Sequence, residues 1–308
     1  MVHIHTHQHE GPHVHGPAPF GRAFAIASFM NAALVAAQVV YGVLAHSVAL
    51  LADAGHNFGD VLGLLLAWGA YAMSSSVPTK RYTYGLQSAS ILAALLNSLI
   101  LLVATGAIAW QAILRIYNPS EVAGVTVMAV AAIGILVNGA SAFLLSAGRK
   151  HDLNIRAASL HLLGDAAISL GVVVTGGIIA LTSWYWIDPA ASLIISALIV
   201  WGTWRVLREA AMLSLAAVPE DVDPSKVRDY LGALDGVSEV HDLHIWAMST
   251  TEVALTAHLV RPGAGLDDEL LKQAADELAE RFKIRHVTLQ IEAGNSEQAC
   301  RLAPDSVI

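Results

Sequence analysis

Six long apolar stretches occupy the first two thirds of the 308-residue chain and restrict its fold more than any other feature. Each exceeds the ~20 residues that an α-helix needs to cross ~30 Å of hydrocarbon. The composition agrees, because only 14% of the residues are charged, whereas soluble domains have about a quarter. We therefore expect an all-α transmembrane bundle of six helices over residues 21–211, with spans near 22–45, 48–73, 88–115, 122–147, 157–182 and 188–211.

Lysine and arginine predict the orientation of these helices. Basic residues lie before the first span, in the second and fourth connections and at the end of the sixth span, at Arg22, Lys80, Arg81, Arg149, Lys150, Arg156, Arg205 and Arg208. The opposite side has only Arg115. Since short loops rich in lysine and arginine stay in the cytoplasm, we expect both termini there, in an integral protein of a bacterial inner membrane.

The chain becomes polar and acidic after about residue 212. Its periodicity predicts helices over 224–234 and 266–282 and strands over 237–247, 251–261 and 286–292. The order α-β-β-α-β indicates a small cytoplasmic α+β domain over 212–293, followed by a loose tail, 294–308. The formal net charge of −8 gives no reason to expect a nucleic-acid partner.

Residues 1–20 form a separate segment, with six histidines among the first fifteen positions. Glycine and proline fill the gaps between them, so we expect a flexible segment without a packed core. Two interpretations stay open. The histidines either gather cytoplasmic metal near the entrance of the membrane domain or belong to an expression tag.

Five ionisable residues lie inside the expected spans and away from their ends: Asp53, His56, Asp60, His161 and Asp165. A charge near the bilayer centre costs at least ~2.5–3.5 kcal/mol on insertion scales, so such residues usually mark a pathway or a partner. His56 and Asp60 are an i, i+4 pair, as are His161 and Asp165, so each pair occupies one face of its helix. For either pair alone, a structural hydrogen bond between helices is the alternative.

Two such helices facing each other present two imidazoles and two carboxylates, a set that suits tetrahedral Zn²⁺. Magnesium and calcium prefer more oxygen ligands, and Cu(I) prefers thiolates. The four residues therefore predict a site for Zn²⁺ or a similar divalent metal. The role of Asp53 stays open between a partner of the ligands, a proton-carrying group and a contact at a helix terminus.

Similar motifs on antiparallel helices favour a secondary transporter, whose site near the bilayer midplane is reached from each side in turn. Protons compete with metal for histidine and aspartate, so a proton gradient is expected to drive export. The sequence has neither a Walker-type loop nor a His-Glu-x-x-His motif, and we expect no enzymatic activity. A membrane-bound divalent-metal sensor with the same ligands and a passive channel are the alternatives.

Six stretches resemble the cation diffusion facilitator family of zinc exporters, in matching order: 47–60, 81–85, 161–165, 241–246, 257–259 and 286–292. The resemblance implies six helices, a cytoplasmic domain of metallochaperone (ferredoxin-like) fold, and a homodimer. It also implies exchange of metal for protons at His56, Asp60, His161 and Asp165. Histidine at the first of these positions implies Zn²⁺ as substrate, with Cd²⁺ or Co²⁺ as further candidates.

The resemblance also implies a second, structural or regulatory Zn²⁺ site in the cytoplasmic domain. His241, His258 and Glu292 occupy positions that bind metal in relatives, whereas Gln290 occupies a further ligand position and is a poor metal ligand. The candidates to replace it are His244, His286 and Cys300, although the two histidines also fit a purely structural role in strands. A loop site known in some relatives is expected to be absent, because residues 74–81 have no suitable ligand.

Overall fold

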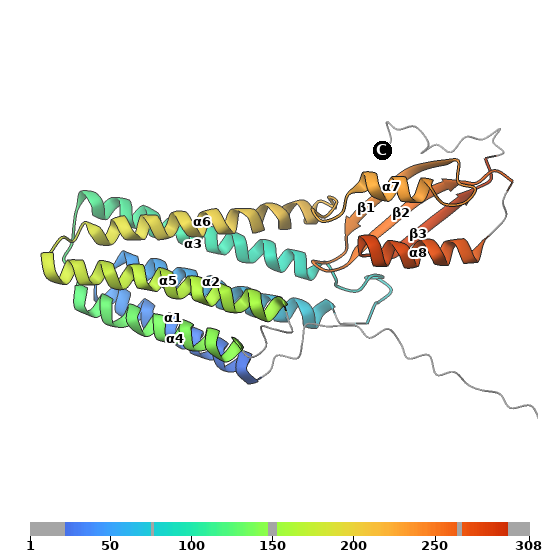
Figure 1. The fold of residues 1–308 in the computed structure, drawn as a ribbon. Helices are drawn as coiled ribbons and strands as arrows, with labels where there is room; N and C mark the ends of the chain where they lie inside the picture. Colours follow the sequence, from blue (N-terminus) through green and yellow to red (C-terminus); the bar gives the residue numbers. More distant parts are fainter. Residues whose placement is uncertain (1–21, 75–76, 147–152, 264–266, 295–308) are drawn as a thin grey trace, which may run out of the picture. The chain divides into compact units, whose positions relative to one another are not determined.

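The computed structural model describes residues 22–74, 77–146, 153–263 and 267–294. Six long helices are followed by two shorter helices and three strands in the order α-β-β-α-β (Figure 1). The expected fold class, a transmembrane helical bundle with a C-terminal α+β domain, is confirmed. The histidine-rich segment 1–20 and nearly all of the tail 294–308 lie outside the described residues.

The long helices agree closely with the expected spans. The largest difference is in the fifth helix, which begins at Leu153 instead of near residue 157. Their bounds are α1 Arg22–Leu44, α2 Val48–Ser74, α3 Ala89–Tyr117, α4 Gly124–Ser146, α5 Leu153–Thr182 and α6 Ile187–Ser214.

Five of these helices, all except α2, are long and apolar enough to cross a membrane over their described residues. α2 has sufficient length, at 27 residues. However, its first half contains the polar residues Asp53, His56, Asn57 and Asp60. Its polar residues must therefore face protein, because unsatisfied polar groups in hydrocarbon are costly.

The chain divides into two compact units, which we describe separately: Met1–Val61 with Thr105–Ala197, and Leu62–Ala104 with Leu198–Ile308. In the first unit, α4 packs against both α1 and α5. The backbones of α4 and α5 approach closely at Gly176, where an added Cβ would lie 2.7 Å from the backbone nitrogen of Met128. This close approach holds α5, the helix that carries His161 and Asp165, in position against α4.

The second unit contains the α+β domain. Its elements are α7 Pro224–Gly232, β1 Glu239–Ala247, β2 Val253–Val260, α8 Asp268–Phe282 and β3 Ile284–Glu292. The three strands form one sheet in the order β1-β2-β3, with β1 antiparallel and β3 parallel to β2. The parallel pair requires a crossover, and α8 supplies it.

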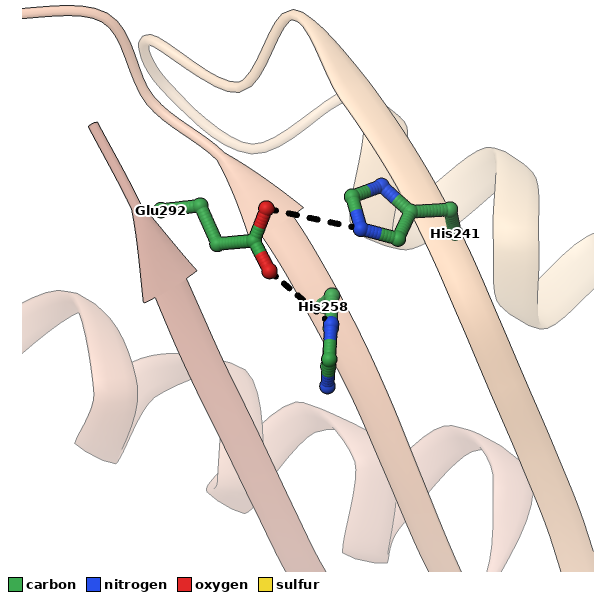
Figure 2. Close-up of side chains that lie close together, drawn as sticks. All are labelled: His241, His258 and Glu292. Carbon is green, nitrogen blue, oxygen red and sulfur yellow. Dashed lines mark ion pairs between the residues drawn. The ribbon is translucent and has the colours of Figure 1, made fainter. Parts of the chain in front are cut away.

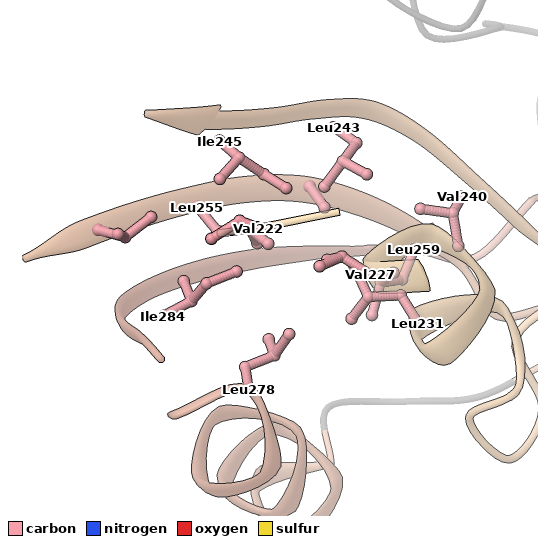
Figure 3. Packing of buried hydrophobic residues seen from close by; sticks show 12 residues of the cluster. Val222, Val227, Leu231, Val240, Leu243, Ile245, Leu255, Leu259, Leu278 and Ile284 are labelled. Carbon is pink, nitrogen blue, oxygen red and sulfur yellow. The ribbon is translucent and has the colours of Figure 1, made fainter. Parts of the chain in front are cut away.

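The core of this domain lies between the sheet and its two helices (Figure 3). Leu231 of α7 and Leu278 of α8 pack with Leu255, Leu259 and Ile284 of the sheet, and all five are fully buried. Alternate residues of β2 point away from this core. That second face of the sheet carries His258.

Candidate metal centres

The four residues expected to bind metal in the membrane domain come together between α2 and α5. Nε2 of His56 lies 2.9 Å from Oδ1 of Asp165, and Nε2 of His161 lies 3.0 Å from Oδ1 of Asp60. Each histidine therefore contacts an aspartate of the other helix. Nε2 of His161 is also 3.9 Å from Oδ2 of Asp165, and the two imidazole rings meet edge to face with centroids 5.9 Å apart.

The burial of this group is uneven. The side chain of Asp165 is 3% exposed, whereas that of His161 is 52% exposed. Ligand atoms of His56, Asp60 and Asp165 lie within 4.8 Å of one another. Oδ2 of Asp60 is buried and has no hydrogen-bond partner among the described residues. Buried acceptors are nearly always satisfied, so this oxygen fits a cation bound among the four side chains. Metal binding by these residues stays a prediction.

A second polar group lies beside these residues, and it includes Asp53, whose role the sequence leaves open. Asp53 accepts hydrogen bonds from Gln38 of α1 and Ser169 of α5, and Gln38 accepts one from Asn57. All four residues are at most 2% exposed. A polar residue every third or fourth position of an apolar helix is the signal that points to such a group.

The α+β domain holds a separate cluster on the face of its sheet (Figure 2). His241 of β1 pairs directly with His258 of β2, and their rings lie edge to face at 5.2 Å. Glu292 of β3 reaches both: its Oε1 is 2.9 Å from Nδ1 of His258, and its Oε2 is 3.5 Å from Nε2 of His241. The structure thus brings the three predicted residues together, with ligand atoms within 4.8 Å of one another.

These residues fit a bound metal ion. His241 is 3% exposed, yet neither ring nitrogen has a hydrogen-bond partner among the described residues. The nearest carboxylate oxygens, from Glu239 and Glu292, are each 3.5 Å from a ring nitrogen, too far for a good hydrogen bond. A cation held by His241, His258 and Glu292 would satisfy one of these nitrogens.

The structure also places the other cytoplasmic candidates. Gln290 lies opposite His258 in the sheet and donates from Nε2 to Oε1 of Glu292, so it contacts a candidate ligand directly. His244 lies 2.8 Å from Asp242, and His286 packs against the ring of Tyr84.

Neither histidine belongs to the cluster of His241, His258 and Glu292. Cys300 lies outside the described residues. Asp242 was not a sequence candidate, yet its Oδ2 is 3.4 Å from Nε2 of His258. A bulge in β1 and a positive φ at Asp242 give it this position, and sequence periodicity does not predict bulges.

Two family models match the chain. One, described as the cation efflux transmembrane domain, matches residues 24–213. The other, described as the cation efflux protein cytoplasmic domain, matches residues 219–294. Together they cover both parts of the architecture described above.

Several curated proteins are similar over nearly their whole length. The metal cation efflux system protein CzcD of Cupriavidus metallidurans is 34% identical over 96% of this chain and 92% of its own. The zinc transporter ZitB of Escherichia coli is 35% identical over 94% and 92%. A cadmium, cobalt and zinc/H(+)-K(+) antiporter of Bacillus subtilis is 29% identical over 95% and 96%.

Among solved structures, the metal-bound C-terminal domain of the CzcD transporter from Cupriavidus metallidurans is 40% identical to this chain. The match covers 23% of this chain and 99% of that domain. The TM-score is 0.22, so the likeness carries no argument about the fold.

Proposed function

The chain belongs to the cation efflux family and is an integral membrane protein, and on this premise we propose that it is a metal/proton antiporter. It exports Zn²⁺ from the cytoplasm, with Cd²⁺ and Co²⁺ as further candidate substrates. His56, Asp60, His161 and Asp165 form its transport site. The observation that carries the proposal is the pair of crossed histidine–aspartate contacts between α2 and α5, beside a buried carboxylate oxygen that has no partner in the described part of the chain.

The ligand chemistry supports zinc as the substrate. Two imidazole nitrogens and two carboxylate oxygens suit Zn²⁺, which takes four ligands at about 2.0–2.2 Å. Calcium needs six to eight oxygens, and magnesium prefers oxygen ligands in octahedral geometry. Cadmium and cobalt accept the same donors, which is why they remain candidates. Two relatives are named for zinc transport or for exchange of cadmium, cobalt and zinc.

The same contacts support exchange for protons. At about 3 Å, each histidine nitrogen is close enough to an aspartate oxygen to share one proton with it. Metal binding requires neutral histidine and ionised aspartate, so Zn²⁺ and protons compete for these atoms. Facing the cytoplasm, the site loses protons when it binds metal. Facing a more acidic exterior, where an ordinary histidine with a pKa near ~6.5 gains a proton, it releases the metal.

The cytoplasmic cluster supports a second role for zinc. In this proposal His241, His258 and Glu292 hold a structural or regulatory Zn²⁺ on the face of the sheet. The His258→Ala variant should then bind less zinc per chain. If this variant also transports less zinc while its membrane site still binds the metal, the cytoplasmic site has a regulatory role. Equal zinc content in both proteins would contradict the assignment.

Orientation and assembly belong to the same proposal. Both termini lie in the cytoplasm of a bacterium, because the basic residues gather at the connections on one side of the membrane. The chain acts as a homodimer in the inner membrane, with a transmembrane domain over 21–211 and a cytoplasmic domain over 212–293. Cross-linking in native membranes tests the dimer, and protease access in inverted vesicles tests the orientation.

Zinc flux in proteoliposomes tests the transport site. With a proton gradient imposed, wild-type protein should accumulate Zn²⁺ and release protons, as followed by a zinc dye and a pH dye. His56→Ala and Asp165→Ala should abolish both signals while the protein stays folded. The control is His46→Asn, because His46 is exposed, has a positive φ that asparagine tolerates, and lies outside the site.

The outcomes separate the competing functions. Normal transport by both site variants would refute the site assignment. Zinc flux without proton movement would indicate a passive channel. Zinc binding without any flux would indicate a sensor.

A further inference from the structure

Four polar side chains form a hydrogen-bonded layer beside the candidate transport site, and we name it the Asp53 layer: Gln38, Asp53, Asn57 and Ser169. Oδ2 of Asp53 accepts from Nε2 of Gln38 at 2.6 Å and from Oγ of Ser169 at 3.0 Å. Nδ2 of Asn57 donates to Oε1 of Gln38 at 3.0 Å. The layer therefore joins three helices, α1, α2 and α5, through the buried carboxylate of Asp53 and the buried amide of Gln38.

Asp53 and Ser169 of this layer lie one helical turn from the metal-binding residues, on the same sides of α2 and α5. On α2, Asp53 precedes His56 by three residues. On α5, Ser169 follows Asp165 by four. Since each residue turns an α-helix by about 100°, Asp53 and Asp60 are only about 20° apart around the axis of α2. A constraint on Asp53 is therefore a constraint on the direction of the α2 ligands.

We propose that Asp53 is a positioning residue of the transport site, which fixes the rotation of α2 and its distance from α5. Gln38 sets the rotation, because its amide holds both Asp53 and Asn57 against α1. Ser169 sets the distance, because its hydroxyl ties α5 directly to Asp53. This inference rests on the proposed transport function of the four metal-binding residues.

A small rotation of α2 is enough to disturb a metal site. Side chains reach about 5–6 Å from the axis of an α-helix, so a rotation of about 20° moves a ligand atom by about 2 Å. Metal–ligand distances are kept within about 0.2 Å of their preferred values. His56 and Asp60 therefore need α2 to be held in one orientation, and the Asp53 layer holds it one turn away.

Gly134 of α4 shows how closely the layer is covered. A Cβ added there would lie 3.0 Å from Oγ of Ser169 and 3.4 Å from Nε2 of Gln38, the two atoms that donate to Asp53. Glycine thus lets α4 close over the layer without displacing either donor. Gln38, Asp53 and Ser169 are fully buried as a result, so water does not compete for their hydrogen bonds.

Substitutions at Asp53 test the proposal in proteoliposomes. Asp53→Ala removes the acceptor, and it should raise the Zn²⁺ concentration for half-maximal transport about 10- to 100-fold, the range of losses seen when groups that orient metal ligands are removed. Asp53→Asn keeps an acceptor for Gln38 and turns an amide donor towards Ser169, so it should stay within about threefold of wild type. Equal loss in both variants would overturn the proposal, because charge and not position would then be required.

Two further variants on α5 form a matched pair. Ser169→Ala removes one donor to Asp53 and should raise the half-maximal concentration several-fold. Thr175→Val removes a buried hydroxyl whose one hydrogen bond among the described residues goes to the carbonyl of Gly171 in its own helix, and it should leave transport unchanged. If Asp53→Ala is not recovered as folded protein, Ser169→Ala is the variant that tests the proposal. Wild-type kinetics in Ser169→Ala would then overturn it.

Bound Co²⁺ gives a readout that a general loss of stability would not change. The visible absorption of Co²⁺ depends on its coordination geometry. The His161→Ala variant retains the cytoplasmic cluster, so subtracting its spectrum from that of each protein leaves the absorption of Co²⁺ at the transport site. This difference spectrum should differ from that of the wild type in Asp53→Ala and match that of the wild type in Asp53→Asn. An unchanged spectrum in Asp53→Ala refutes a positioning role. Normal zinc transport by His161→Ala would instead refute the proposed site itself, so the two failures are distinguishable.

Discussion

Asp188 anchors the first turn of α2, and its removal is the most informative test of how this helix is held. The carboxylate lies in the first turn of α6 and is fully buried. Its Oδ2 accepts from the backbone nitrogen of Val48 at 2.7 Å, and its Oδ1 accepts from the hydroxyl of Ser47 at 2.5 Å. Ser47 in turn accepts from the backbone nitrogen of Leu50, so two side chains satisfy the start of α2.

The magnitude follows from the two short hydrogen bonds. A hydrogen bond to a charged group contributes about 1.5–3 kcal/mol, so Asp188→Ala should cost about 3–6 kcal/mol of stability. The contact with the backbone nitrogen of Ala49, at 3.4 Å, is too long to add much. Asp188→Asn retains one acceptor oxygen and should cost about half as much.

Thermal unfolding in detergent, followed by size-exclusion chromatography, measures this difference. At about 2–4 °C per kcal/mol for a domain of 150–250 residues, Asp188→Ala should lower the midpoint by about 6–24 °C. Asp235→Ala, at an exposed aspartate of the cytoplasmic domain, is the control and should shift it by less than about 2 °C. If Asp188→Ala shifts the midpoint as little as the Asp235→Ala control does, water replaces the carboxylate and the anchoring role is refuted.

Two further predictions concern packing and pH. Gly176→Ala should destabilise the membrane domain by about 1–3 kcal/mol, because the new Cβ meets backbone atoms of α4. Gly171→Ala, in the same helix with open space around it, should not, and equal midpoints for the two variants would contradict the close contact. Backbone and Arg261 hydrogen bonds hold the pKa of Asp267, which caps α8, below its usual value. This stabilisation is complete above about pH 4 and is lost as the pH falls through the lowered pKa, so urea unfolding should show a smaller cost of Asp267→Ala at pH 3 than at pH 7.

The sequence by itself determined which segments form long apolar helices and which residues are candidates for metal binding. Length and hydropathy set the six helices, because a helix in lipid must satisfy its backbone hydrogen bonds internally. The i, i+4 spacing put His56 beside Asp60 and His161 beside Asp165, because helical periodicity is a local property. Alternation in β2 likewise placed His258 on one face of the sheet.

Only the tertiary structure decided which of these residues meet. The contact between His56 and Asp165 joins positions far apart in the chain, and it depends on how α2 and α5 are rotated and how closely they approach. Asp188 lies at the start of the sixth expected span and is therefore not among the five ionisable residues inside the spans, yet it is the buried anchor of α2. Local patterns fix the face on which a side chain lies, whereas packing between helices fixes what it touches.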